Sequence, residues 1–265
     1  MNRWVYYSTL AGAGYLMLHY LAIRSLYYPM RHPDGWWEQQ SRLGAEDVWL
    51  RSAGGLKLHG WWKEAPGARV ATVFLHGNAG NVTHRGMHMH EIAAAGSSVL
   101  VVDYRGYGRS EGKPTESGLY ADGDAAFEWV AAKGLPVVIH GESLGSAVAV
   151  DVASRKQCAG VVLETPFNSA RAAAGRVLPL IGPLLIWSYD SKAKIGRVKA
   201  PLLVIHGNED EVIHYSLGRD LFAAANDPKE HWTVEGGHHN DLVETAGPRY
   251  RERLSRFYEM VRQRL

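Results

Sequence analysis

A serine lies at the centre of a glycine-flanked pentapeptide, GESLG, at residues 141–145. The apolar run 137–140 before it predicts a strand, and the Ala- and Val-rich stretch after it predicts a helix. At a sharp turn from strand to helix, this motif presents a serine hydroxyl above a sheet, where it can act as a nucleophile. The sequence therefore predicts covalent catalysis by Ser143, with the backbone amide of Leu144 as one donor to an oxyanion.

A serine hydroxyl is a weak nucleophile until a base removes its proton, and that base needs a carboxylate to orient it. In this arrangement the acid precedes the histidine along the chain, and both follow the serine. Two acidic residues follow apolar runs, Asp210 and Glu164, and two adjacent histidines, His238 and His239, come later in a glycine-containing segment. The sequence order permits a Ser–acid–His triad and leaves two candidates for each partner.

Five short apolar runs predict the strands that position these residues. They are residues 70–75, 98–102, 137–140, 160–163 and 202–206. Such runs are typical of buried parallel strands, and the helix-length segments between them, such as 121–132 and 143–154, are typical of crossover helices. An antiparallel hairpin is expected earlier, at 47–51 and 56–62. The chain is thus predicted to be an α/β domain with a mostly parallel central sheet flanked by helices.

Several motifs together carry a resemblance to a known family. They are HGNAGN at 76–81, DYRGYGRS at 103–110, GESLG at 141–145, HGNED at 206–210 and HND at 239–241. With these motifs the chain resembles the α/β-hydrolase superfamily from about Tyr27 to the C-terminus, and within it the membrane-anchored Bem46-like branch. The resemblance implies an α/β-hydrolase fold with a short cap inserted at about residues 168–199.

The resemblance also implies roles for individual residues. Ser143 matches the nucleophile, Asp210 the acid and His239 the base, since His239 directly precedes Asn-Asp; the adjacent histidine and the other acid remain alternatives. The two oxyanion donors implied are the backbone amides of Asn78 and Leu144. The chain departs from the family at residues 213–215, where Ile-His-Tyr replaces a frequent proline. This chemistry requires no metal and no organic cofactor.

Composition excludes several classes of protein. The 29 Lys and Arg residues against 27 Asp and Glu residues give a formal net charge of +2, which offers no electrostatic case for nucleic acid. Cys158 is the single cysteine, so an intrachain disulfide and a cysteine-based zinc site are excluded. A zinc-protease motif starting at His90 fails because position 94 is alanine. The oligomeric state stays open.

The N-terminal segment differs from the rest of the chain. Residues 4–23 carry no acidic or basic side chain apart from a neutral His19, and arginines bound them on both sides. As a helix, this segment spans about 30 Å, the thickness of a bilayer core, and aromatic residues at both ends resemble interfacial belts. We expect residues 1–26 to form a single-pass membrane anchor, with its orientation open, for a hydrolase domain at 27–265. A cleaved signal peptide and a buried or interfacial helix are the alternatives.

Two other segments bear on lipid contact. Residues 177–187 are uncharged, and they could form a cap wall over an acyl pocket, a patch dipping into lipid or part of the core. Residues 248–265 carry six arginines against two glutamates and repeat apolar residues at helical spacing. They predict an amphipathic helix whose basic face is either solvated or attracted to anionic headgroups beside the anchor.

Together these features predict a lipase-like, membrane-associated serine hydrolase. Its substrates would be carboxylic esters or thioesters of hydrophobic acyl groups, cleaved through an acyl-enzyme, as in a lipid esterase, a lysophospholipase, a monoacylglycerol lipase or an acyl-protein thioesterase. The partners expected are such a substrate and membrane lipid. The alternative is a catalytically silent hydrolase-like domain that binds a lipid or another partner at the membrane.

Overall fold

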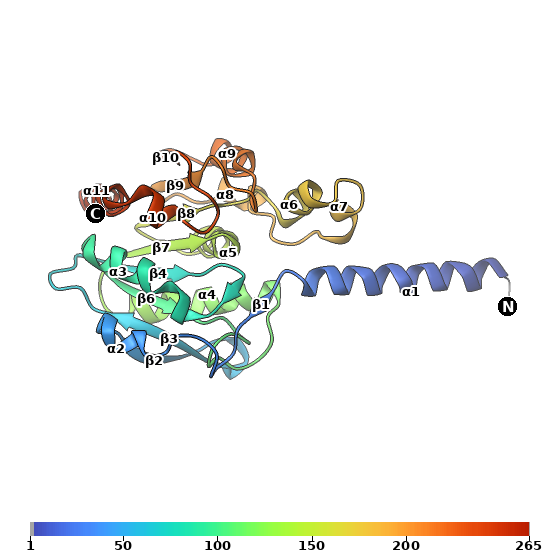
Figure 1. The fold of residues 1–265 in the computed structure, drawn as a ribbon, viewed down its shortest axis with the longest axis horizontal. Helices are drawn as coiled ribbons and strands as arrows, with labels where there is room; N and C mark the ends of the chain where they lie inside the picture. Colours follow the sequence, from blue (N-terminus) through green and yellow to red (C-terminus); the bar gives the residue numbers. More distant parts are fainter. Residues whose placement is uncertain (1–2, 265) are drawn as a thin grey trace.

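The computed structural model describes residues 3–264, and an eight-stranded sheet forms the centre of this part of the chain (Figure 1). The strand order across the sheet is β10-β9-β8-β7-β4-β6-β3-β2. The pairs β2–β3 and β3–β6 are antiparallel, whereas the other neighbouring pairs are parallel. The bounds are β2 (Glu46–Arg51), β3 (Lys57–Lys63), β4 (Val70–Leu75), β6 (Ser97–Val102), β7 (Val137–Glu142), β8 (Gly160–Glu164), β9 (Leu202–Gly207) and β10 (Lys229–Val234).

Helices cover both faces of the sheet, and each face has its own apolar core. Alternate side chains of β4 show the division, since Val73 and Leu75 belong to one core and Phe74 to the other. The first core includes residues of α4 (Glu116–Ala131), α5 (Leu144–Ala153), α8 (Lys192–Ile195) and α9 (Tyr215–Ala224). The second includes residues of α3 (Gly86–Ala94), α10 (Leu242–Ala246) and α11 (Pro248–Arg262). This is the expected three-layer α/β arrangement.

Shorter elements complete the described chain. The two-residue strands β1 (Tyr28–Pro29) and β5 (Ala79–Gly80) pair in parallel beside the main sheet. The remaining short elements are η1 (Ala53–Gly55), α2 (Gln39–Leu43) and η2 (Val82–Arg85).

The five buried strands and the hairpin expected from the sequence are confirmed, but β10 is an additional strand. Its sequence, KEHWTV, alternates polar and apolar residues weakly, and only Val234 at its end is buried. β10 nevertheless pairs in parallel with β9 along its whole length. An edge strand of this kind needs only one neighbour, so its residues do not have to be continuously apolar.

The N-terminal segment forms α1 (Arg3–Arg24), a single helix that extends away from the sheet (Figure 1). Among residues 3–264, no helix combines the length and the apolar character that a membrane crossing requires. The expected single-pass crossing by residues 4–23 is therefore not supported. Polar and glycine residues within the helix, among them Ser8, Thr9 and His19, lower its hydropathy.

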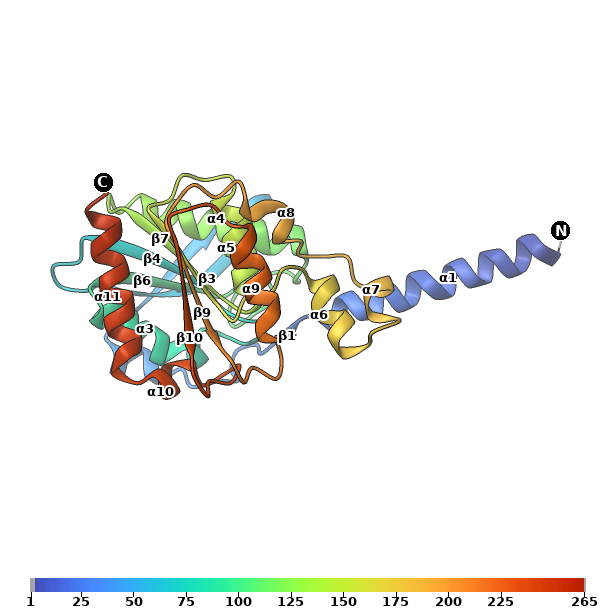
Figure 2. The ribbon, with the colours of Figure 1, turned by 90° about the horizontal axis from the view of Figure 1, so that it is seen from above.

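The cap region lies between β8 and β9 and contains α6 (Ala170–Val177) and α7 (Gly182–Leu185) in addition to α8. Figures 1 and 2 both show α6 and α7 beside the C-terminal half of α1, at one end of the molecule. In the same two views α11 lies at the opposite end. The arginine-rich helix is amphipathic as expected, and it does not lie beside the N-terminal segment.

Candidate active site

Ser143 occupies the turn between β7 and α5, where the backbone is strained. Its φ of 51° lies in the left-handed region, which a non-glycine residue adopts at a cost. The flanking glycines are required by close approach, since a Cβ on Gly145 would lie 1.9 Å from the carbonyl oxygen of Leu75. The amide of Ser143 donates to the carbonyl of Glu164 on β8 at 2.9 Å. The sharp strand-to-helix turn predicted around Ser143 is thus present in the structure.

Ser143, His239 and Asp210 form a continuous chain of hydrogen bonds. Ser143 Oγ lies 3.0 Å from His239 Nε2, and His239 Nδ1 lies 2.8 Å from Asp210 Oδ2. All three residues are buried, with exposed fractions of 7% for Ser143, 9% for His239 and 6% for Asp210. In this geometry Nδ1 carries the proton donated to the carboxylate, which leaves Nε2 free to accept the serine proton.

The loop after β9 holds Asp210 in place. Its Oδ1 accepts hydrogen bonds from the amides of Val212 and Ile213, at 2.9 and 2.7 Å. Its Oδ2 also lies 3.2 Å from Nε2 of His206, the histidine at the end of β9. Burial raises the pKa of Asp210, but the hydrogen bonds from His206 and His239 outweigh it and hold the pKa below its usual range. The acid is therefore ionised at neutral pH.

His206 contacts Asp210, a role that the sequence does not predict. Its ring is fully buried, and Nε2 also lies 3.0 Å from the carbonyl oxygen of Ile213. The sequence offered one signal for this role: His206 ends a buried strand four residues before Asp210. Its partner, however, depends on how the loop folds back, and that information is not local.

The two alternative partners lie elsewhere. His238 is on the surface, where Nδ1 lies 3.1 Å from Oε2 of Glu211, and this hydrogen bond raises the pKa of His238. Glu164 receives hydrogen bonds from His140 at 2.5 Å, from His88 at 3.2 Å and from the hydroxyl of Tyr250. Burial raises the pKa of Glu164, but the two histidines more than offset it and leave the pKa well below its usual range. The hydrogen bonds of these two side chains are therefore made to residues other than Ser143, His239 and Asp210.

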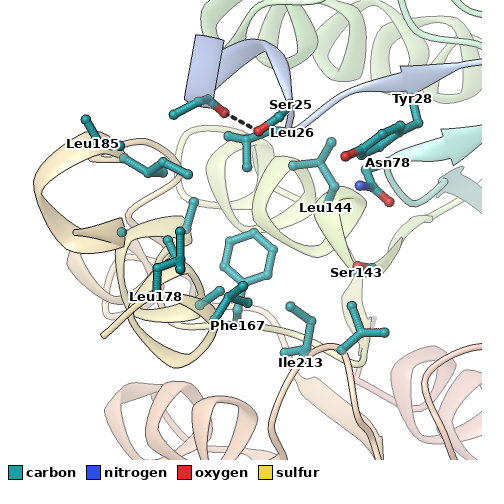
Figure 3. Close-up of a pocket in the computed structure, with 18 residues that line it drawn as sticks. Ser25, Leu26, Tyr28, Asn78, Ser143, Leu144, Phe167, Leu178, Leu185 and Ile213 are labelled. Carbon is teal, nitrogen blue, oxygen red and sulfur yellow. Dashed lines mark hydrogen bonds between the residues drawn. The ribbon is translucent and has the colours of Figure 1, made fainter. Parts of the chain in front are cut away.

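The loop that carries Asn78 is anchored beside Ser143. The carbonyl of Asn78 accepts hydrogen bonds from the amide of Tyr28 at 3.0 Å and from the hydroxyl of Tyr107 at 2.8 Å. These two bonds orient the peptide between Asn78 and Ala79, which directly follows the amide of Asn78. Asn78, Leu144 and Ser143 line the same cavity (Figure 3). The two residues predicted to supply oxyanion donors are therefore next to the serine.

Glu142, inside the pentapeptide, links the serine turn to this loop. Its Oε2 accepts a hydrogen bond from the amide of Gly77 at 3.3 Å and forms an ion pair with Arg85 Nε at 2.7 Å. Arg85 also donates to the carbonyl of Ala79 at 3.1 Å. Burial raises the pKa of Glu142, but the charge of Arg85 outweighs burial, so the pKa of Glu142 lies below its usual value. Contacts from Glu142 and Arg85 thus bracket Asn78 on both sides.

A cavity of about 390 Å³ opens at Ser143, within the size range of small-molecule sites. Most of its walls are apolar. They include residues of the C-terminal end of α1 and the turn after it (Ala22, Ser25, Leu26), of the cap (Ala173, Ala174, Val177, Leu178, Leu185, Ile186) and of the loop after Asp210 (Val212, Ile213). Within residues 3–264, no cluster of three or more His, Cys, Asp or Glu side chains is arranged to hold a metal ion. The site can accommodate an apolar group next to a hydroxyl nucleophile.

Comparisons with known proteins show which family this chain belongs to. Residues 66–192 match the family described as serine aminopeptidase, S33. The chain is 38% identical over 229 residues to the uncharacterised protein Rv2307c of Mycobacterium tuberculosis, which covers 82% of this chain and 80% of that protein. It is 37% identical over 201 residues to human alpha/beta hydrolase domain-containing protein 17B, which covers 73% of this chain and 67% of the relative.

Solved structures share the fold at lower identity. The esterase Pf2001 of Pyrococcus furiosus superposes with a TM-score of 0.76, covering 89% of this chain and 98% of that one, at 20% identity. An α/β hydrolase from Vibrio vulnificus superposes with a TM-score of 0.67 at 22% identity, covering 82% and 85% of the two chains. These likenesses establish a common fold. The comparisons do not distinguish the Bem46-like branch from other branches.

Proposed function

Because this chain belongs to the α/β-hydrolase superfamily, we propose that it is a membrane-associated serine hydrolase that cleaves carboxylic esters or thioesters of hydrophobic acyl groups. One observation carries the proposal: the hydrogen-bonded chain of Ser143, His239 and Asp210 opens directly into an apolar cavity. The first part supports nucleophilic catalysis, and the second supports an acyl substrate.

In the proposed mechanism, Ser143 Oγ attacks the acyl carbonyl carbon while His239 Nε2 accepts its proton. The amides of Leu144 and Asn78 bind the oxyanion of the tetrahedral intermediate. The intermediate collapses to an acyl-serine, and His239 protonates the departing alcohol or thiol. Water then attacks the acyl-serine with His239 as base, which releases the carboxylic acid and restores the serine. Asp210 stays ionised and stabilises the imidazolium that forms twice in this cycle.

Exposed apolar residues of the cap support the membrane part of the proposal. They are Val177, Leu178, Leu180, Ile181, Leu184 and Trp187, with Leu180 86% exposed and Val177 74% exposed. An apolar surface of this kind on a monomer marks an interaction site. The adjoining α1 has no charged side chain between its terminal arginines, so the cap and α1 together offer an uncharged surface to lipid. We propose that this surface rests on or in the lipid interface.

Vesicle binding tests the membrane proposal. The full chain should sediment with phosphatidylcholine vesicles, and the double variant Leu180→Glu/Ile181→Glu should remain largely in the supernatant because two charges then enter the cap surface. Met87→Glu is the matched control, since Met87 is an exposed residue of α3, away from the cap. Equal sedimentation of the double variant and the wild-type chain would contradict a role for the cap.

A chain-length series tests the catalytic proposal. Wild-type protein and Ser143→Ala are compared on p-nitrophenyl esters and the matching thioesters, from acetyl to palmitoyl. The proposal expects turnover by the wild-type chain, a preference for acyl chains longer than acetyl, and loss of turnover in Ser143→Ala. Absence of turnover on every ester and thioester by a folded wild-type chain would instead favour a silent domain that binds a lipid or another partner.

A further inference from the structure

We infer that the C-terminal end of α1 and the turn that follows it form one wall of the acyl-binding cavity, and that the docking of α1 on the cap determines which acyl chains the cavity admits. The inference rests on the proposed function and assigns specificity to a helix that we expected from the sequence to be a membrane anchor. It follows from the lining of the cavity, from the contacts between α1 and the cap, and from the size of the cap helices.

The first observation is the composition of the cavity wall. Ala22, Ser25 and Leu26 line the cavity together with Leu185 and Leu178 of the cap region. Figure 3 shows Ser25 and Leu26 on the α1 side of this space and Leu178 on the cap side, with Ser143 at its inner end. A substrate acyl chain leaving Ser143 must therefore pass between α1 and the cap.

The second observation is a set of polar contacts between α1 and α7. The hydroxyl of Tyr15 donates to the carbonyl of Leu184 at 2.7 Å, and Nδ1 of His19 donates to the carbonyl of Leu185 at 2.7 Å. Since Leu185 is itself a lining residue, the bond from His19 fixes part of the cavity wall directly. A surface helix that lay against the cap only by chance would not be expected to satisfy two consecutive carbonyls at a helix end.

Aromatic stacking adds to these hydrogen bonds. The rings of His19 and Trp187 stack with centroids 4.8 Å apart, and those of Tyr15 and Trp187 stack at 6.2 Å. Beyond the end of α1, the hydroxyls of Tyr27 and Tyr189 lie 2.8 Å apart in the buried interior. The N-terminal segment is thus joined to the cap at successive points from Tyr15 to Tyr27.

The third observation is that the cap has little local stability of its own. α7 contains four residues and α6 contains eight, and helices this short are not stable without tertiary contacts. The rest of α1 extends away from the domain (Figures 1 and 2). The contacts of Tyr15 and His19 therefore hold the cap wall and α1 together, and the shape of the cavity depends on both.

Filling the cavity from the α1 side tests the inference. Ala22→Trp places an indole in the cavity wall, and Ala11→Trp is the control because Ala11 is an exposed alanine of the same helix. For Ala22→Trp we expect the ratio of kcat/KM for octanoyl over acetyl p-nitrophenyl ester to fall at least ten-fold, because the indole occupies space that only the longer acyl chain needs. The control should keep the wild-type ratio. A wild-type ratio in Ala22→Trp, or an equal loss on both esters with unchanged thermal stability, would overturn the inference.

A binding measurement separates this inference from the proposed function. In the Ser143→Ala background, a dansyl-labelled dodecanoic acid is titrated and its fluorescence measured with and without Ala22→Trp. We expect Ala22→Trp to weaken binding at least ten-fold, His19→Ala to weaken it several-fold by loosening the cap wall, and Ala11→Trp to leave it unchanged. Because binding needs no turnover, loss of all esterase activity would count against the proposed function alone, whereas unchanged binding in Ala22→Trp would count against the α1 wall.

Discussion

His239 donates its Nδ1 proton to Oδ2 of Asp210 across 2.8 Å, although 29 residues separate them in sequence. The neighbouring His238 points to the surface and pairs with Glu211. Two adjacent histidines of the same loop therefore have different environments. Because one ring is buried between Ser143 and Asp210 and the other is solvated, substitutions at these positions form a matched pair.

His239→Ala should lower kcat by about 10³-fold or more, because the serine then has no base and the acyl-enzyme has no group to activate water. His238→Ala should retain nearly all activity, because its side chain contacts only surface carboxylates. Steady-state kinetics on a short-chain ester measures both. A large loss of activity in His238→Ala together with retained activity in His239→Ala would show that His238, and not His239, is the base.

His206→Phe should lower kcat about ten-fold while changing KM little. The substitution removes the N–H that lies 3.2 Å from Asp210 Oδ2 and 3.0 Å from the carbonyl of Ile213, so the acid and its loop lose a common tether. His206→Gln, which keeps an N–H donor, should recover part of the loss. If the two variants were equally impaired in kcat, the effect would come from packing and not from the hydrogen bond to Asp210.

Arg85→Ala should lower kcat about ten-fold or more with a smaller effect on KM. The loop carrying Asn78 loses the hydrogen bond from Arg85 to the carbonyl of Ala79, and Glu142, which holds the amide of Gly77, loses its counter-ion. Arg85→Lys should restore the charge but not both contacts, and should be intermediate. Arg251→Ala is the control, since Arg251 pairs with Glu91 on α3. We expect Arg85→Ala to lower kcat to the same extent for every substrate, and Arg251→Ala to change thermal stability alone. Unchanged kcat in Arg85→Ala would contradict the role given to Arg85.

His231 on β10 should contribute to acid sensitivity. Burial, together with the nearby charge of Arg219, lowers the pKa of His231 from 6.5 to about 4. Between these pH values the unfolded chain binds the proton and the folded chain does not, so the free energy of unfolding falls as the pH falls from 6.5 to 4. His231→Phe should reduce this fall by about 1 kcal/mol, less than the full shift implies because the ring is partly accessible to solvent.

The comparison needs denaturant unfolding at pH 7 and pH 4.5 for the wild-type chain and the variant. His90→Gln, at an exposed position of α3, is the control and should follow the wild type. Parallel pH dependence in the wild-type chain and His231→Phe would show that His231 does not protonate differently in the folded and unfolded states.

The parts of the fold that the sequence predicts are those set by local signals. The continuous apolar runs predict β4, β6, β7, β8 and β9, and the glycines around Ser143 predict the turn because only glycine tolerates the approach to the carbonyl of Leu75. β10 is missed because an edge strand with one neighbour needs no apolar run. Local sequence therefore specifies the central sheet better than its boundary.

The parts that the sequence does not predict depend on contacts between distant residues. The bond from Tyr15 to Leu184 joins residues 169 positions apart, and no periodicity encodes it. His206 ends a predicted strand, but its partnership with Asp210 arises only when the following loop folds back. The uncharged N-terminal segment predicts a helix correctly, yet its role in the cavity follows from its docking on the cap.

The most direct test of a serine nucleophile at residue 143 is labelling with a fluorophosphonate, followed by peptide mass spectrometry. The probe should add to one peptide, with the modification on Ser143, and Ser143→Ala of confirmed fold should not be labelled. Labelling of the folded wild-type chain on a different serine, or no labelling of it at all, would contradict the catalytic assignment.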